Sequence, residues 1–108
     1  MSTVQKYIDD NIDTFKDELF QLLRIESIST DSSKKSDVKK AAKFLAGHLK
    51  EVGLDDVKLH ETDGHPIVTA RKVVDPELPT VLIYGHYDVQ PPDPEDLWET
   101  PPFEATVK

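Results

Sequence analysis

The chain has 108 residues, of which 37% are hydrophobic and 31% charged, and its formal net charge is −8. This balance is typical of one globular domain rather than of a disordered chain, and the acidic charge disfavours nucleic acid and anionic membranes as partners. Because the sequence has no cysteine, disulfides and thiolate metal sites are excluded, and a metal ion would have to be held by His, Asp or Glu.

The first predicted element is an amphipathic helix over residues 4–25, where apolar side chains recur every three or four positions. Ser2 or Thr3 is the expected N-cap. The polar, acidic residues 1–13 differ from a signal peptide, and no apolar run of the sequence reaches the roughly 18 residues of a membrane span. We therefore expect a cytoplasmic protein.

A second helix is predicted over residues 38–52, with Ser36 or Asp37 as its cap and Gly53 as the residue that ends it. The Ser- and Thr-rich residues 27–36 between the helices read as a loop. We interpret this loop as a connector; the alternative is that it forms the rim of an active site.

Strand patterns fill the next part of the chain. Residues 55–62 alternate apolar and polar side chains, the pair Asp63-Gly64 marks a turn, and residues 66–74 continue as a second strand, so a hairpin is expected. Residues 80–85 form a continuous apolar run, which predicts a central strand covered on both faces.

The fold class expected from these elements is α/β, with helices packed on a mixed β-sheet. The connection between the second and third strands is too short for a parallel crossover, which needs about a dozen residues. Residues 103–107 resume the alternation of a strand, and the sequence stops there, at Lys108. We therefore expect residues 1–108 to be one portion of a larger domain.

His86 and Asp88 follow the apolar run directly. In an extended chain, residues two positions apart point to the same side, roughly 6.6 Å apart. A carboxylate at that distance could orient the imidazole through one ring nitrogen and leave the other for a metal ion. The sequence alone leaves open a plainer interpretation, in which His86 is a loop histidine paired with its neighbour.

The residues around this pair resemble the first metal-binding segment of the two-zinc exopeptidase and deacylase superfamily. That superfamily includes carnosine dipeptidases, aminoacylases, acetylornithine deacetylase and succinyl-diaminopimelate desuccinylase. The wording "YGHYDVQPP" is most similar to the cytosolic nonspecific dipeptidase branch, and "LLRIESIST" resembles the superfamily's opening helix and turn. The matching residues are Gly85, His86, Asp88, Val89, Pro91, Pro92, Trp98, Pro102 and Phe103.

The resemblance implies that the chain is the N-terminal portion of a zinc-peptidase catalytic domain, without the remainder of that domain and its lid domain. It implies that His86 is a zinc ligand and that Asp88 is the catalytic-site carboxylate that orients it. Two zinc ions per full-length active site are implied, with manganese or cobalt as other possible metals. The expected substrate of the full-length parent is a dipeptide, and the 108 residues alone are expected to be inactive.

Two other functions stay open at this point. One is deacylation of N-acyl amino acids by the same two-zinc chemistry, and the other is a non-catalytic interaction module. A partial sheet would also leave an apolar face or edge uncovered, so we expect the chain to form a homo-oligomer.

Overall fold

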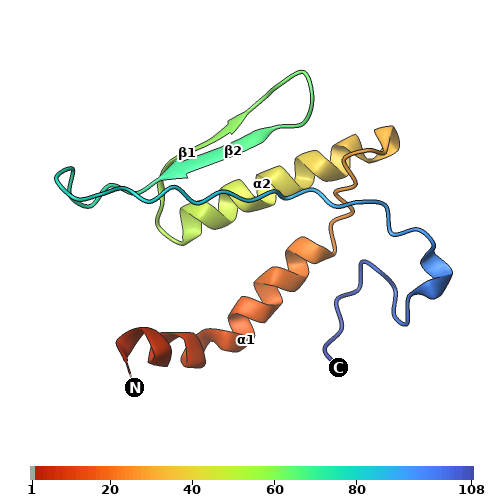
Figure 1. Ribbon diagram of the computed structural model, residues 1–108, viewed down its shortest axis with the longest axis horizontal. Helices are drawn as coiled ribbons and strands as arrows, with labels where there is room; N and C mark the ends of the chain where they lie inside the picture. Colours follow the sequence, from red (N-terminus) through yellow and green to blue (C-terminus); the bar gives the residue numbers. More distant parts are fainter. Residues whose placement is uncertain (1) are drawn as a thin grey trace. The chain divides into compact units, whose positions relative to one another are not determined.

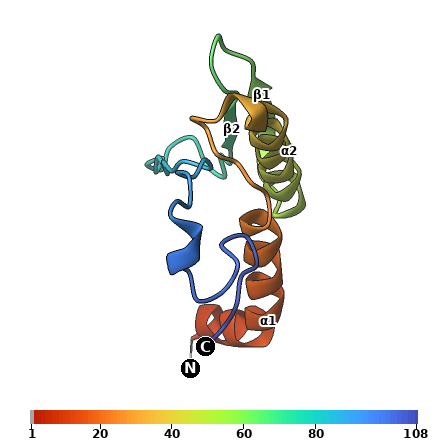
Figure 2. The ribbon, with the colours of Figure 1, turned by 90° about the vertical axis from the view of Figure 1, so that its right-hand side faces the viewer.

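The structure is a computed structural model that describes residues 2–108. The chain divides into two compact units, which are traced in the ribbons of Figures 1 and 2. One unit consists of Met1–Ile25 together with Pro92–Lys108, and the other is Glu26–Pro91. No helix in the described part of the chain is long and apolar enough to cross a membrane.

The first unit contains helix α1, Thr3–Leu23, and a short 3-10 turn, η2, Glu95–Leu97. The predicted helix and one of its two predicted caps are confirmed, since the Ser2 hydroxyl accepts a hydrogen bond of 3.0 Å from the backbone N–H of Gln5. No residue of α1 is buried. The strand predicted at 103–107 is wrong, because these residues pair with no other strand among the described residues.

The second unit is built on helix α2, Lys35–Glu51, which continues directly from the 3-10 turn η1, Ser32–Lys34. The predicted caps, Ser36 and Asp37, are wrong, because both lie inside the first turn of α2. Asp31 takes the capping role instead, since its side chain accepts a 2.9 Å hydrogen bond from the backbone at the start of η1. The capped turn therefore starts the helix several residues earlier than its apolar stripe indicates.

The predicted hairpin follows α2 after Gly53, whose φ of 91° confirms it as the left-handed residue that ends the helix. Strands β1, Asp55–His60, and β2, Ile67–Arg71, pair in antiparallel fashion. Figure 1 shows α2 running along this hairpin, and Figure 2 shows the two as adjacent layers. The half-buried strand residues are Val57, Leu59, Val68 and Ala70. The buried residues of α2 are Val38, Ala41 and Ala42.

The α/β class is confirmed, because a helix packs against a sheet, but the described sheet is an antiparallel pair rather than a mixed one. The prediction of a covered third strand is wrong: Val81–Tyr84 forms no strand, and its side chains are 81–90% exposed. An apolar run becomes a strand only when a neighbouring strand takes up its backbone N–H and C=O groups. No strand of the described residues does so here.

Candidate metal-ligand site

The segment His86–Val89, here called the docked segment, is held by the residues Ser27–Ser29, here called the serine loop. Ile28 and Val89 form a parallel β-bridge, and the Val89 N–H donates to the Ser27 carbonyl at 2.9 Å. The Ser27 hydroxyl donates to the Tyr87 carbonyl at 3.0 Å. Ser27 and Ile28 are only 2% and 6% exposed, so this short ladder is part of the interior of the second unit.

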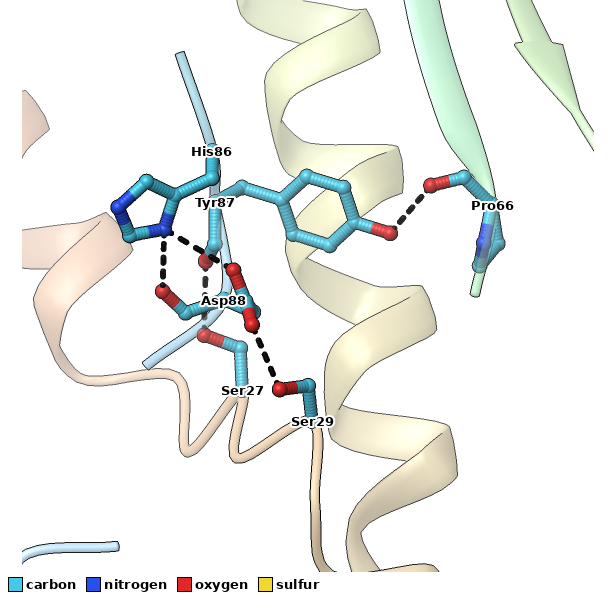
Figure 3. A network of polar contacts seen from close by, with 6 residues as sticks. All are labelled: Ser27, Ser29, Pro66, His86, Tyr87 and Asp88. Atoms are coloured by element: carbon cyan, nitrogen blue, oxygen red, sulfur yellow. Dashed lines mark hydrogen bonds and ion pairs between the residues drawn. The ribbon is translucent and has the colours of Figure 1, made fainter. Parts of the chain in front are cut away.

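The structure brings the two predicted site residues, His86 and Asp88, into direct contact. His86 Nδ1 lies 2.9 Å from Asp88 Oδ1 and 3.1 Å from the Asp88 carbonyl oxygen. Both oxygens accept, so Nδ1 carries the proton and donates to them. In Figure 3 the other nitrogen, Nε2, points away from these contacts, and 76% of the His86 side chain is exposed. A neutral ring with the proton at Nδ1 has its lone pair at Nε2, on the side away from these contacts.

The carboxylate of Asp88 is shared between two donors that come from distant parts of the sequence. Its Oδ1 accepts from His86, while its Oδ2 accepts from the Ser29 hydroxyl at 2.6 Å. The pKa of Asp88 is lowered from its ordinary value chiefly by the Ser29 hydrogen bond, with burial opposing and the His86 contact adding to the effect. The carboxylate is thus kept ionised and available to His86.

Two further contacts hold the serine loop and the docked segment from outside. The Ser29 carbonyl lies 2.8 Å from His65 Nε2, and because a carbonyl only accepts, His65 donates from Nε2. The Tyr87 hydroxyl donates to the Pro66 carbonyl at 2.5 Å (Figure 3). Burial raises the pKa of Tyr87, and the charges of Asp88 and Glu61 raise it further.

Sequence reasoning named neither Ser29 nor His65 individually, and Ser29 entered only through the alternative that residues 27–36 form the rim of an active site. The interpretation of residues 27–36 as a connector missed the contact that Ser29 makes 59 positions along the chain. One signal was present: Ser27 and Ser29 stand two positions apart, so in an extended segment they face one side. In the structure both hydroxyls bond to the docked segment.

The donor set of the site fits one metal–imidazole bond. A metal-binding histidine commonly gives its second ring N–H to a carboxylate, and His86 does so. Within residues 2–108, no group of three or more His, Cys, Asp or Glu side chains is placed to hold a metal ion. The described residues therefore place fewer than three such donors around any one position, and His86 is the candidate donor of this site.

Comparison with known proteins relates the chain to the metallodipeptidases, which confirms the resemblance predicted from the sequence. No family model matches the chain.

Among the relatives is the Cys-Gly metallodipeptidase DUG1 of Saccharomyces cerevisiae, with 33% identity over 119 residues, covering 99% of this chain and 25% of that protein. The Beta-Ala-His dipeptidase of Rattus norvegicus is 34% identical, covering 94% of this chain and 23% of its own length. A solved structure of the dipeptidase Dug1p from Saccharomyces cerevisiae superposes with a TM-score of 0.85 at 34% identity, over 95% of this chain and 24% of that one. The chain thus spans about a quarter of the length of these relatives.

Proposed function

We propose that the chain is the N-terminal portion of the catalytic domain of a metal-dependent dipeptidase, and that it contributes His86 as a metal ligand through Nε2. The observation that carries this proposal is the geometry of the imidazole: Nδ1 lies 2.9 Å from Asp88 Oδ1, and 76% of the His86 side chain is exposed. The relatives named as metallodipeptidases and Beta-Ala-His dipeptidases support the reaction class. A cytoplasmic location stays a prediction.

In this proposal Asp88 acts on the imidazole and not on the substrate. Its carboxylate fixes the ring orientation and the tautomer, and its negative charge makes Nε2 a better electron-pair donor. Zinc suits an imidazole donor, and manganese or cobalt stay the other possible metals expected from the sequence. A bound divalent ion would supply Lewis-acid polarisation of the scissile amide carbonyl of a dipeptide.

The 108 residues alone are proposed to bind zinc weakly and to hydrolyse no dipeptide. A structural zinc site takes four protein donors and a catalytic one takes three, whereas His86 is one donor. In the proposed two-zinc centre, the remaining ligands and the general base would be supplied by other parts of the whole enzyme.

Two measurements test the proposed function. Zinc titration of the 108-residue chain, followed by NMR of the histidine rings, should move the His86 ring signals without reaching tight stoichiometric binding, and His86→Ala should remove this response. His48→Ala is the matched control and should leave it. If the His86 signals do not respond to zinc, the ligand assignment is wrong.

The second measurement concerns the reaction. The protein that the gene encodes in full, loaded with zinc, should hydrolyse dipeptides in preference to N-acyl amino acids, and His86→Ala should abolish the activity. Preferential cleavage of N-acyl amino acids would replace the dipeptidase proposal with a deacylase. If His86→Ala keeps its activity on both kinds of substrate, His86 has no role in the reaction.

We also propose that the 108-residue chain self-associates through Val81–Tyr84. These four side chains are 81–90% exposed, and an uncharged apolar segment with unpaired backbone groups is a template for strand addition. Light scattering should show a mass above that of the monomer, and Ile83→Lys should lower it. A monomer mass for the unsubstituted chain at high concentration would contradict this.

A further inference from the structure

We infer that Ser29 is a positioning residue for His86, acting through the carboxylate of Asp88. This inference rests on the proposed role of His86 as a metal ligand. Among the described residues, Ser29 makes no hydrogen bond to the imidazole and is linked to it through Asp88. Its hydroxyl binds Asp88 Oδ2 at 2.6 Å and thereby holds the carboxylate plane at the torsion that points the other oxygen toward the ring.

The argument starts from the freedom of an aspartate side chain. Its terminal torsion is broad and roughly two-fold, so a carboxylate held by one contact can rotate away from that contact. Asp88 is held at both oxygens, at Oδ2 by Ser29 and at Oδ1 by His86, as Figure 3 shows. Because 41% of the Asp88 side chain is exposed, water would compete for Oδ1 if Ser29 did not hold the group.

Ser29 is itself placed by contacts that do not involve the carboxylate. Its carbonyl accepts from His65 Nε2 at 2.8 Å, and its neighbour Ile28 forms the β-bridge with Val89. The serine hydroxyl therefore comes from a fixed backbone, and a fixed donor can select one orientation of the acceptor. A serine on a mobile loop would move together with the carboxylate and would not fix its torsion.

The consequence is a fixed imidazole tautomer. With Asp88 Oδ1 facing the ring, Nδ1 keeps the proton and Nε2 keeps the lone pair that a metal ion needs. When the carboxylate turns away, Nδ1–H keeps the longer contact to the Asp88 carbonyl at 3.1 Å but loses its charged acceptor, so the share of rings with a lone pair at Nε2 falls. Ser29 thus acts on the metal-binding atom through two hydrogen bonds.

The test is the tautomer of His86 in the metal-free chain, read from the ¹⁵N chemical shifts of the two ring nitrogens at about pH 9, where an ordinary imidazole is neutral. The unsubstituted chain should show His86 protonated at Nδ1. Ser29→Ala should lower the ratio of the Nδ1–H to the Nε2–H form by about fivefold, the effect of losing roughly one hydrogen bond. Ser29→Thr, which keeps a hydroxyl, should restore the ratio.

Ser27→Ala is the matched control, because it removes a hydroxyl from the same loop that binds the Tyr87 carbonyl and not the carboxylate. It should leave the His86 tautomer unchanged. If Ser29→Ala keeps the original ratio, or if Ser27→Ala changes it equally, Ser29 is not a positioning residue. Should the alanine variant fail to fold, Ser29→Cys gives the same reading, since the weak thiol donor should lower the ratio partly.

The readout needs no metal ion, so it separates this inference from the proposed function. A His86 ring that ignores zinc but changes tautomer in Ser29→Ala would overturn the ligand assignment and keep the positioning role. A ring that responds to zinc but keeps its tautomer in Ser29→Ala would keep the ligand assignment and overturn the positioning role.

Discussion

The docked segment, His86–Val89, and the apolar run Val81–Tyr84 are neighbours in the sequence but differ in exposure and in their contacts with other segments. The apolar run has the stronger strand pattern, yet its side chains are 81–90% exposed. The docked segment contains His and Asp, yet it is bridged to the serine loop and hydrogen-bonded through both backbone and side chains. The difference shows that an available partner segment, more than local hydrophobicity, decides which residues pair with another part of the chain.

The largest expected effect comes from substituting the residue that forms the bridge. Ile28→Ala should lower the free energy of unfolding by about 2–5 kcal/mol, because it truncates a buried isoleucine. Ile83→Ala is the matched change in the apolar run, where the side chain is 89% exposed, and should alter stability by less than about 0.5 kcal/mol. Urea denaturation measures both, and equal effects would remove the contrast between the two segments.

A smaller effect is expected for zinc binding when the carboxylate of the docked segment is removed. Asp88→Ala deletes the carboxylate that accepts from His86 Nδ1 and leaves the carbonyl of residue 88 as the remaining acceptor, so it should weaken zinc binding at His86 by about 10–100-fold, the usual effect of losing such a partner. Zinc titrations followed by the His86 ring signals provide the measurement.

Asp96→Ala serves as the control for this prediction, because it removes one negative charge from the exposed turn η2. It should leave zinc binding at His86 nearly unchanged. An equal loss in both variants would mean that net charge, and not the contact to His86, determines the affinity.

The third effect concerns the buried hydroxyl of the serine loop. Ser27→Ala deletes the donor to the Tyr87 carbonyl and should cost about 1 kcal/mol of stability. Ser33→Ala removes an exposed hydroxyl that binds only within its own turn, to Asp31, and should cost less. Thermal unfolding of the two variants compares them, and a larger loss in Ser33→Ala would contradict the role given to Ser27.

Local patterns predicted much of this structure because they depend on neighbours in the sequence. The two helices follow from the spacing of apolar residues, and the hairpin follows from alternation around Asp63-Gly64. The His86–Asp88 contact was predictable from two residues on one side of an extended segment. Each of these features is fixed within a few residues of chain.

The failures concern contacts that close over long separations. The spacing of Ser27 and Ser29 indicates a shared side of the loop but not the aspartate 59 positions away, because serine hydroxyls are common in loops and bond to many acceptors. The strand predicted at residues 80–85 failed because strand formation needs a partner, which the apolar run itself does not specify. The predicted caps of α2 failed because Asp31 starts a 3-10 turn before the apolar stripe begins.

The smallest effect is expected from a pair of tyrosines that lie one in each segment. Tyr87→Phe removes the hydroxyl that donates to the Pro66 carbonyl and should cost about 0.5 kcal/mol, at the low end for a hydrogen bond because Tyr87 is only half-buried. Tyr84→Phe makes the same chemical change where the side chain is 87% exposed and should have no measurable effect. Urea denaturation with many replicates can resolve the two. The His86 tautomer should be the same in both, since neither hydroxyl touches the Asp88 carboxylate. If Tyr84→Phe lowered the stability more than Tyr87→Phe, the apolar run would be making contacts that the docked segment lacks. The apolar run would then contribute more to stability than the docked segment.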